Sequence, residues 1–371
     1  MAMIAQMMEK AIAEHKKGNL QEAEQVYREV LAAEPRHVDA NHNLGVLLSS
    51  KHQTNDALGF FYLALEENKN VEQFWSSYIE ALISLNDLDK AIEAIKSAKV
   101  AGFSGTKFDN LLRRTRTPAQ LYAAGEFFIA KDGNYLNFLK ALHENIYEGY
   151  FEIGTRTGTS LALSNSPSVS IDPFFQLNVS PVGNKDLCLM FQETSDSFFE
   201  NRLSFLSGLK CQLAFIDGMH LFEYALRDFI NLAKISSEKS LFLFHDVIPY
   251  SFEMTTRNFK DLPIGAAWTG DIWKLVHIFI DAGMKENVKI LTSGPTGLLA
   301  VLNPDEKSVS MLENNYDQIC SEWLDVNLSG DTIERFYESG VFEKPQLYLD
   351  YLRTISFGKK AENHSKEWVS H

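Results

Sequence analysis

The sequence predicts an all-α helical repeat domain followed by an α/β domain whose doubly wound sheet ends in an antiparallel β-hairpin. Three observations carry this prediction. Residues recur at a period of 34 within the first hundred positions. Beyond them, short and continuously apolar runs alternate with stretches of helical periodicity. The last two apolar runs are separated only by a short turn rich in Gly and Pro. At 371 residues the chain has the length of two domains.

The period of 34 is carried by small and by large residues at separate offsets. Small residues recur where two helices approach closely, at Ala23, Ala57 and Ala91, and aromatic ones four positions later, at Tyr27 and Phe61. One helix pair cannot bury its apolar face alone, so we expect three stacked pairs. The predicted helices cover residues 3–16, 20–33, 38–50, 54–66, 71–85 and 88–99.

This pattern resembles the tetratricopeptide repeat family over residues 3–100. Leu44-Gly45, Trp75 and Pro35 are further matches, while the third unit lacks the aromatic residue, as a terminal repeat can. The resemblance implies a concave surface that binds a protein or peptide partner. The alternatives are a rigid spacer or a dimerisation element, which would make the protein a homo-oligomer.

From Gly102 onward the period disappears and runs of strand length begin. Runs that are apolar at every position predict strands buried on both faces of a parallel sheet, and the segments between them predict helical crossovers. The five predicted parallel strands cover residues 150–153, 169–171, 187–191, 213–216 and 241–244. The short connection between residues 288–291 and 298–302 predicts an antiparallel hairpin.

The first of these strands ends in a turn that runs from Glu152 through Gly154 and Thr155 to Gly158. Its glycines allow the backbone to turn tightly and approach a ligand, and the start of the next helix offers free N–H groups. Asp172 follows twenty residues after Glu152, where a carboxylate can accept hydrogen bonds from ribose hydroxyls. The turn lacks the third glycine of the dinucleotide fingerprint, which disfavours a dinucleotide oxidoreductase.

Polar residues also end the fourth and fifth strands, with Asp-Gly-Met-His at residues 217–220 and His-Asp at 245–246. The helix between them carries Arg-Asp-Phe at 227–229. With these elements, residues 135–303 resemble class I S-adenosylmethionine-dependent methyltransferases, which have a Rossmann-like fold. The resemblance implies S-adenosylmethionine as cofactor and the hydroxyl of a sugar or other small compound as acceptor. The cofactor-binding residues that it implies are Glu152, Gly154, Thr155, Gly158, Asp172, Thr194, Ser195 and Asp217.

Methyl transfer to a hydroxyl requires alignment of the acceptor and often removal of its proton. We predict His245, Asp246 and His220 as the catalytic residues; the alternative is that Asp246 caps a helix and the two histidines are structural. A divalent cation such as magnesium is a further alternative, with Asp217 and Asp246 as its ligands. A histidine beside them and Met219 in the preceding turn count against it, because magnesium prefers oxygen ligands.

A cluster after the fifth strand is predicted to contact the acceptor. Trp268 and Trp273 flank Asp271, and Lys274 follows; aromatic faces can stack on sugar rings while the charged groups fix orientation. The alternative is a helix start with both tryptophans buried against the sheet.

The composition narrows the partners and the compartment. An excess of 49 acidic over 35 basic residues, a net charge of −14, argues against nucleic acid. Cys188, Cys211 and Cys320 have no zinc or disulfide spacing, which indicates a reducing compartment. The first residues do not form a signal sequence, and no apolar run approaches the ~20 residues of a membrane span. We therefore expect a cytoplasmic protein.

We expect domain boundaries at residues 1–101, 102–304 and 305–371. The last segment contains predicted helices at 311–324 and 332–337 and a polar tail from 358. Two alternatives to a small-molecule O-methyltransferase remain open. One is a protein methyltransferase whose repeats hold the polypeptide, and the other is a non-catalytic adaptor built on the repeats with a cofactor-binding domain.

Overall fold

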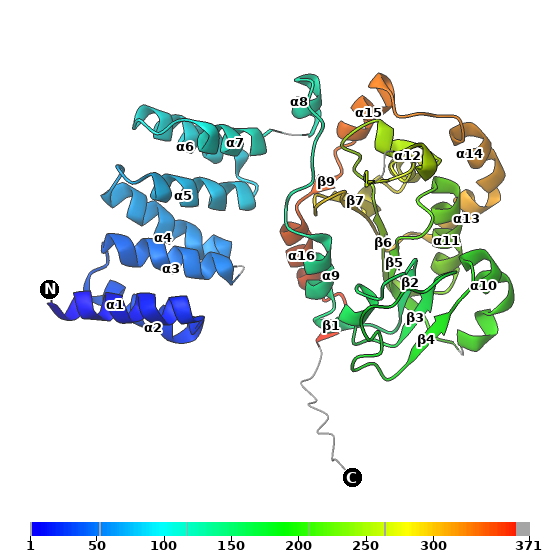
Figure 1. Ribbon diagram of the computed structural model, residues 1–371, viewed down its shortest axis with the longest axis horizontal. Coiled ribbons are helices and arrows are strands. Elements are labelled where there is room, and N and C mark those ends of the chain that lie inside the picture. Colours follow the sequence, from blue (N-terminus) through cyan, green and yellow to red (C-terminus); the bar gives the residue numbers. More distant parts are fainter. Residues whose placement is uncertain (1, 52, 117, 207, 263–264, 361–371) are drawn as a thin grey trace, which may run out of the picture. The chain divides into compact units, whose positions relative to one another are not determined.

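The chain forms two compact units, Met1–Leu121 and Tyr122–His371. The computed structural model describes residues 2–51, 53–116, 118–206, 208–262 and 265–360 (Figure 1). No helix within these ranges is long and apolar enough to cross a membrane.

The first unit consists of helix pairs that repeat along the chain, as predicted (Figure 1). The pairs are α1 (Ala2–Lys17) with α2 (Leu20–Ala33), α3 (Val38–Ser50) with α4 (Thr54–Glu67), and α5 (Glu72–Ser84) with α6 (Leu88–Val100). Each helix also contacts the next pair, so that the apolar faces are buried between neighbours. The predicted helix boundaries agree with the observed ones within one residue.

The repeated positions lie in the core of this unit. Ala23, Ala57 and Ala91 are fully buried, and Tyr27 and Phe61 fill the space beside the first two. The close approach is sharpest at α3, where an added methyl group at Gly45 would lie 2.7 Å from the Phe61 ring. The Phe61 ring therefore packs against α3 at a residue without a side chain.

The helical unit extends past the boundary that we expected after residue 101. Helix α7 (Thr106–Arg114) buries Phe108 and Leu111 in the same core as Ile95 and Ala98 of α6. This burial makes α7 part of the repeat unit, whose last short helix α8 (Pro118–Ala123) runs across the division at Leu121.

The second unit is built on a mixed sheet of eight strands in the order β4-β3-β2-β5-β6-β8-β7-β9. Strands β2 to β6 are parallel, β8 runs antiparallel to β6 and β7, and β9 is parallel to β7. The predicted parallel sheet with a terminal antiparallel hairpin is confirmed. The strands are β2 (Tyr150–Ile153), β3 (Ser168–Ile171), β4 (Cys188–Phe191), β5 (Cys211–Ile216), β6 (Ser236–His245), β7 (Val288–Leu291), β8 (Leu298–Leu302) and β9 (Phe342–Glu343).

Helices cover both faces of this sheet. On one face, Leu241 and Leu243 of β6 pack in a core with α9 (Tyr135–Leu142) and α16 (Pro345–Thr354). On the other, Phe242 and Phe244 contact Phe229 of α11 and Phe279 of α12. The bounds of these two helices are Phe222–Lys234 and Lys274–Asp281. Since β3 and β5 flank β2 on opposite sides, the strand order reverses between β2 and β5, as in a doubly wound sheet.

Two expectations about the connections are wrong. The turn after β2 leads into a short 3₁₀ turn at Leu161–Leu163 instead of an α-helix, and the described link between β3 and β4 contains no helix. Among the described residues, α10 (Ser195–Asn201) and α11 are the α-helices between the following parallel strands.

The segment after residue 304 is not a separate domain. Its strand β9 extends the sheet beside β7, and α16 packs on α9. The helix expected over 311–324 is divided at Asn315 into α13 (Glu306–Asn314) and α14 (Tyr316–Trp323), and α15 spans Gly330–Tyr337. Two short antiparallel strands, β1 (Asn145–Ile146) and β10 (Lys359–Lys360), form a separate small sheet. Of the predicted polar tail, residues 361–371 lie outside the described residues.

The contact between Gly45 and Phe61 can be tested by substitution. Gly45→Ala should destabilise the protein by about 1–3 kcal/mol, because the added methyl group overlaps the ring. Adding Phe61→Leu should recover part of that loss. The measurement is the free energy of unfolding in urea, followed by far-UV circular dichroism.

A matched control is Gly59→Ala in α4, where an added methyl group meets no atom within 4 Å. This change should leave the protein equally stable or up to about 1 kcal/mol more stable. If Gly45→Ala behaved like Gly59→Ala, the close packing of α3 on Phe61 would be contradicted.

Candidate functional site

Four ionisable side chains meet at the carboxyl ends of β5 and β6. Asp217 Oδ1 lies 3.2 Å from His220 Nε2 and 3.3 Å from His245 Nδ1. Asp246 Oδ2 lies 3.3 Å from His220 Nδ1 and 3.3 Å from His245 Nδ1. The structure thus brings together all three predicted catalytic residues and Asp217, and we call these four residues the His–Asp cluster.

Each acid in the cluster faces both imidazoles, and this arrangement sets their charge. Burial raises the pKa of Asp217, but hydrogen bonds from His220 and His245 outweigh it and lower the pKa to about 2. Burial lowers the pKa of His245, but Asp217 and Asp246 outweigh it and raise the pKa to about 10. The pKa of His220 is raised against its burial by the same two acids. At neutral pH the His245 ring is therefore protonated beside the Asp217 carboxylate.

The backbone at the cluster adopts a conformation that favours glycine. His220 has a φ of 52° and Asp246 a φ of 59°, both in the left-handed region. Thr296 at the β7–β8 hairpin donates a hydrogen bond to the Asp246 carboxylate. Non-glycine residues keep such angles where neighbouring groups fix them, and these sites are often functional.

Sequence reasoning missed Tyr135, which packs on the cluster. Its ring centroid lies 4.2 Å from that of His245. Burial, with Asp217 and Asp246 adding to it, raises the pKa of Tyr135 to about 12, so the hydroxyl stays protonated. Tyr135 begins α9, ahead of the first central strand, and no motif marks it in the sequence.

The register of the sheet places the predicted cofactor residues beside the cluster. Ile171 of β3 pairs with Ile153 of β2, which pairs with Ile216 of β5, and Ile216 pairs with Phe244 of β6. The residue after each of these lies at the carboxyl end of its strand, and in β6 it is the last residue of the strand itself. These four residues, which we call the strand-end row, are Asp172, Gly154, Asp217 and His245.

The two glycines of the turn are required by the chain itself. Gly154 has a φ of +86°, and a methyl group there would lie 2.1 Å from the carbonyl oxygen of Asp217. Gly158 has a φ of +81°, and a methyl group there would lie 2.9 Å from Leu177. We predicted that these glycines make room for a ligand. In the structure, an added methyl group would meet other atoms of the chain, from Asp217 at Gly154 and from Leu177 at Gly158.

Glu152 and Thr155 point into the protein. Glu152 is fully buried and accepts hydrogen bonds from the Tyr150 hydroxyl and from Ser160 Oγ, the latter at 2.9 Å. Burial raises its pKa to about 7. Thr155 Oγ1 lies 2.7 Å from Ser170 Oγ. These two side chains hold the turn after β2 through hydrogen bonds in the interior. Because both are buried, they do not form a polar surface for a cofactor.

Asp172 and Thr194 both bind backbone N–H groups. The Asp172 oxygens accept from Arg156 N and Phe174 N, each at 2.7 Å, which ties the turn after β2 to the loop after β3. Thr194 is the N-cap of α10 and accepts from Ser197 N at 3.3 Å, and Ser195 is the first residue of that helix. Thr194 therefore has a clear structural role.

Of the predicted acceptor residues, only Trp268 places its side chain against the cluster. Its ring stacks on His220 at 5.1 Å, and its carbonyl oxygen lies 3.0 Å from His220 Nδ1. Trp273 and Lys274 are 1% exposed, and Asp271 is 2% exposed. The prediction that these three contact an acceptor is wrong because α12 begins here and turns them into the interior. Lys274 Nζ donates to the Trp323 carbonyl oxygen at the end of α14.

Among the described residues, Asp217, His220 and Asp246 each offer one potential metal-ligand atom, all within 4.8 Å of one another. Magnesium fits this set poorly, because it prefers oxygen ligands and both ring nitrogens of His220 are directed at acceptors. The protonated ring of His245 also places a positive charge beside Asp217 and Asp246. The magnesium site stays a prediction.

No protein-family model matches the chain, and no curated protein sequence is significantly similar to it. The TPR2B domain of yeast Sti1 in its pHsp70 complex covers 31% of this chain and 97% of its own, with 16% identity and a TM-score of 0.29. The first TPR of Spaghetti (RPAP3) with an HSP90 peptide covers 30% and 89%, with 20% identity and a TM-score of 0.28. Yersinia enterocolitica SycD with a YopD peptide covers 31% and 88%, with 16% identity and a TM-score of 0.28. These likenesses concern TPR-like helical repeats, and no ligand of this chain follows from them.

Proposed function

We propose that the second unit is an S-adenosylmethionine-dependent methyltransferase that acts on a hydroxyl group of a sugar or another small compound. One observation carries the proposal, the strand-end row with the His–Asp cluster beside it. The row crosses the point between β2 and β5 at which the strand order reverses. Ligands of open α/β sheets bind at the carboxyl ends of the strands at such a point.

The residue of this chain that best fits a ribose-bearing ligand is Asp172. Asp172 uses each carboxylate oxygen for one backbone N–H and keeps further lone pairs for hydroxyl groups. Glu152 and Thr155 contribute by holding the turn after β2 rigid. A bound sulfonium would supply the methyl group.

Proton transfer is assigned to His220. Its side chain is 19% exposed against 10% for His245, so it is the imidazole that an acceptor meets first. Asp217 and Asp246 fix the ring, and the stacked Trp268 offers a face for the acceptor. A ring nitrogen must be unprotonated to accept the proton of the acceptor, and a positive charge next to the cluster disfavours the protonated form of the ring.

Ligand binding tests this proposal directly. Isothermal titration calorimetry of the full chain should show micromolar binding of S-adenosylmethionine and S-adenosylhomocysteine and none of NAD. Asp172→Asn should weaken both at least about tenfold, because hydrogen bonds to a charged acceptor are the stronger ones.

The matched control is Asp281→Asn, which removes an exposed carboxylate paired with Arg335 and should leave affinity unchanged. Absence of binding of both sulfur compounds by the folded protein would contradict the methyltransferase proposal. The repeats would then be the working part of the chain.

We also propose that the first unit binds a polypeptide. Stacked helix pairs form an extended surface. On α3 and α4 this unit exposes the large apolar side chains of Val46, Tyr62 and Leu63, and the Tyr62 ring lies 5.9 Å from that of Tyr78. Exposed apolar groups of this kind mark surfaces for partners.

A peptide-display selection on the full chain tests this second function. Selected peptides should bind with micromolar affinity, and Tyr62→Ser should weaken them at least about fivefold by loss of buried apolar area. Phe205→Ser, an equally simple change at an exposed phenylalanine of the second unit, should have no effect. Peptides that bind both variants like the parent chain would contradict a binding surface at Tyr62.

A further inference from the structure

We propose that Arg257 is a positioning residue of the candidate site and holds His220 and Trp268 in place through Asp271. Arg257 lies in the long connection between β6 and α12, outside every motif that the sequence displays. The inference deepens the proposed methyltransferase function by naming a residue that shapes its acceptor side. The effect of Arg257 on the position of Trp268 can be tested without a cofactor.

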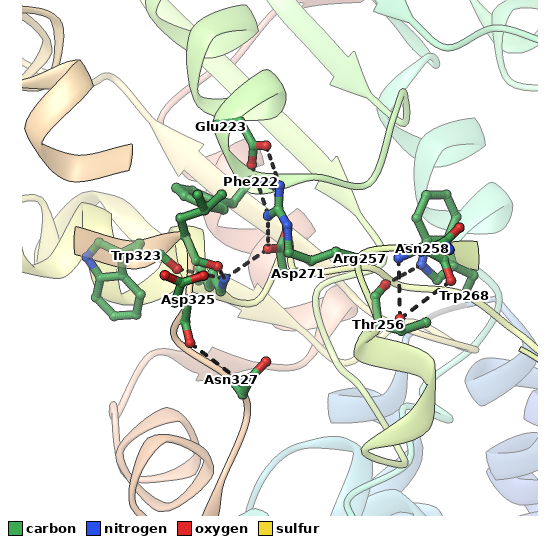
Figure 2. A network of polar contacts seen from close by, with 12 residues as sticks. Phe222, Glu223, Thr256, Arg257, Asn258, Trp268, Asp271, Trp323, Asp325 and Asn327 are labelled. Carbon is green, nitrogen blue, oxygen red and sulfur yellow. Dashed lines mark hydrogen bonds and ion pairs between the residues drawn. The ribbon is translucent and has the colours of Figure 1, made fainter. Parts of the chain in front are cut away.

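Arg257 joins two parts of the unit that are far apart in sequence (Figure 2). Its guanidinium forms a two-pronged ion pair with the Glu223 carboxylate at the start of α11 and a second ion pair with Asp271. It also lies over the Phe222 ring, 5.8 Å from the centroid. With a side chain that is only 33% exposed, these contacts are shielded from water more than a surface pair is.

Asp271 connects Arg257 to the backbone of His220. Its carboxylate also accepts from Phe222 N at 2.8 Å, and its own N–H donates to the His220 carbonyl oxygen at 3.1 Å. The preceding Gly270 packs so closely on His220 that a methyl group there would lie 1.8 Å from the same oxygen. Movement of Asp271 must therefore move the backbone of His220.

Trp268 is held by the segment that carries Arg257. Its Nε1 donates to the Thr256 carbonyl oxygen at 2.7 Å, and Thr269 N donates to Met254 O at 3.0 Å. Residues 254–258 and 268–271 thus form one layer over His220, and Arg257 is its ionic link to α11. Figure 2 shows Trp268 and Thr256 close together and the Arg257 side chain reaching away from them toward Glu223 and Asp271.

The charges explain why an arginine is suited to this place. Asp271 is buried between two cations, since Lys274 Nζ lies 2.9 Å from it. When Arg257 is replaced, Lys274 still neutralises Asp271, so the interior stays paired and the protein should fold. What is lost is the bridge to Glu223. A lysine at 257 has a single ammonium and cannot reproduce the fork that spans both acids.

The test is ¹⁹F NMR of the full chain labelled with 5-fluorotryptophan, with the Trp268 resonance assigned by its loss in Trp268→Phe. Arg257→Gln should shift and broaden the Trp268 resonance, because its ring leaves the His220 stack. The resonances of Trp75, Trp273 and Trp323 should stay in place. Arg257→Lys should restore the Trp268 signal only in part.

The matched control is Arg335→Gln, which breaks the exposed pair with Asp281 and should leave all tryptophan resonances unchanged. An unmoved Trp268 resonance in folded Arg257→Gln would overturn the proposal. So would a common shift of Trp268, Trp273 and Trp323, because it would show a general structural role. Failure of the parent chain to bind S-adenosylmethionine would contradict the proposed function and leave this result unaffected.

Discussion

The second unit depends on the register between its parallel strands. Because Ile216 pairs with Phe244, the residues that follow them, Asp217 and His245, come out of the sheet side by side. The same pairing across β2 brings Gly154 against the carbonyl of Asp217, where only a residue without a side chain fits. A shift of one residue between β5 and β6 would separate the acids from the imidazoles and turn their side chains to the opposite face. The His–Asp cluster is thus a consequence of strand pairing, and the long connection after β6 then covers it.

Most of this architecture can be predicted from the sequence. The period of 34 determines the helix pairs because the small and aromatic positions that carry it are core contacts, as at Ala57 and Phe61. Continuously apolar runs indicate buried strands for a similar reason. The missing helix after Gly158 could not be predicted, because residues 159–163 suit a helix locally while the turn is held by Glu152, Ser160 and Asp172. Burial of α7 was missed because it continues the core without repeating the pattern.

The site was predictable where its residues end strands and less so elsewhere. Asp217, His220, His245 and Asp246 follow apolar runs directly, which makes them recognisable. Trp273 and Lys274 have the residue types of a binding surface, yet the start of α12 turns them inward, and a sequence does not show which way a helix faces. Tyr135 contacts the cluster and Arg257 contacts Asp271 beside it, each from a distant segment, so no local signal identifies them.

The central claim is that Asp217 and Asp246 hold the His245 imidazole of the cluster in the charged form. ¹⁵N NMR of histidine-labelled protein measures this directly, with the His245 ring assigned through His245→Gln. The ring of His245 should remain protonated well above neutral pH, with a pKa of about 10, and Asp217→Asn should lower that pKa markedly. If His245 instead titrates near the ordinary histidine value of about 6.5 and is insensitive to Asp217→Asn, the cluster does not exist as described.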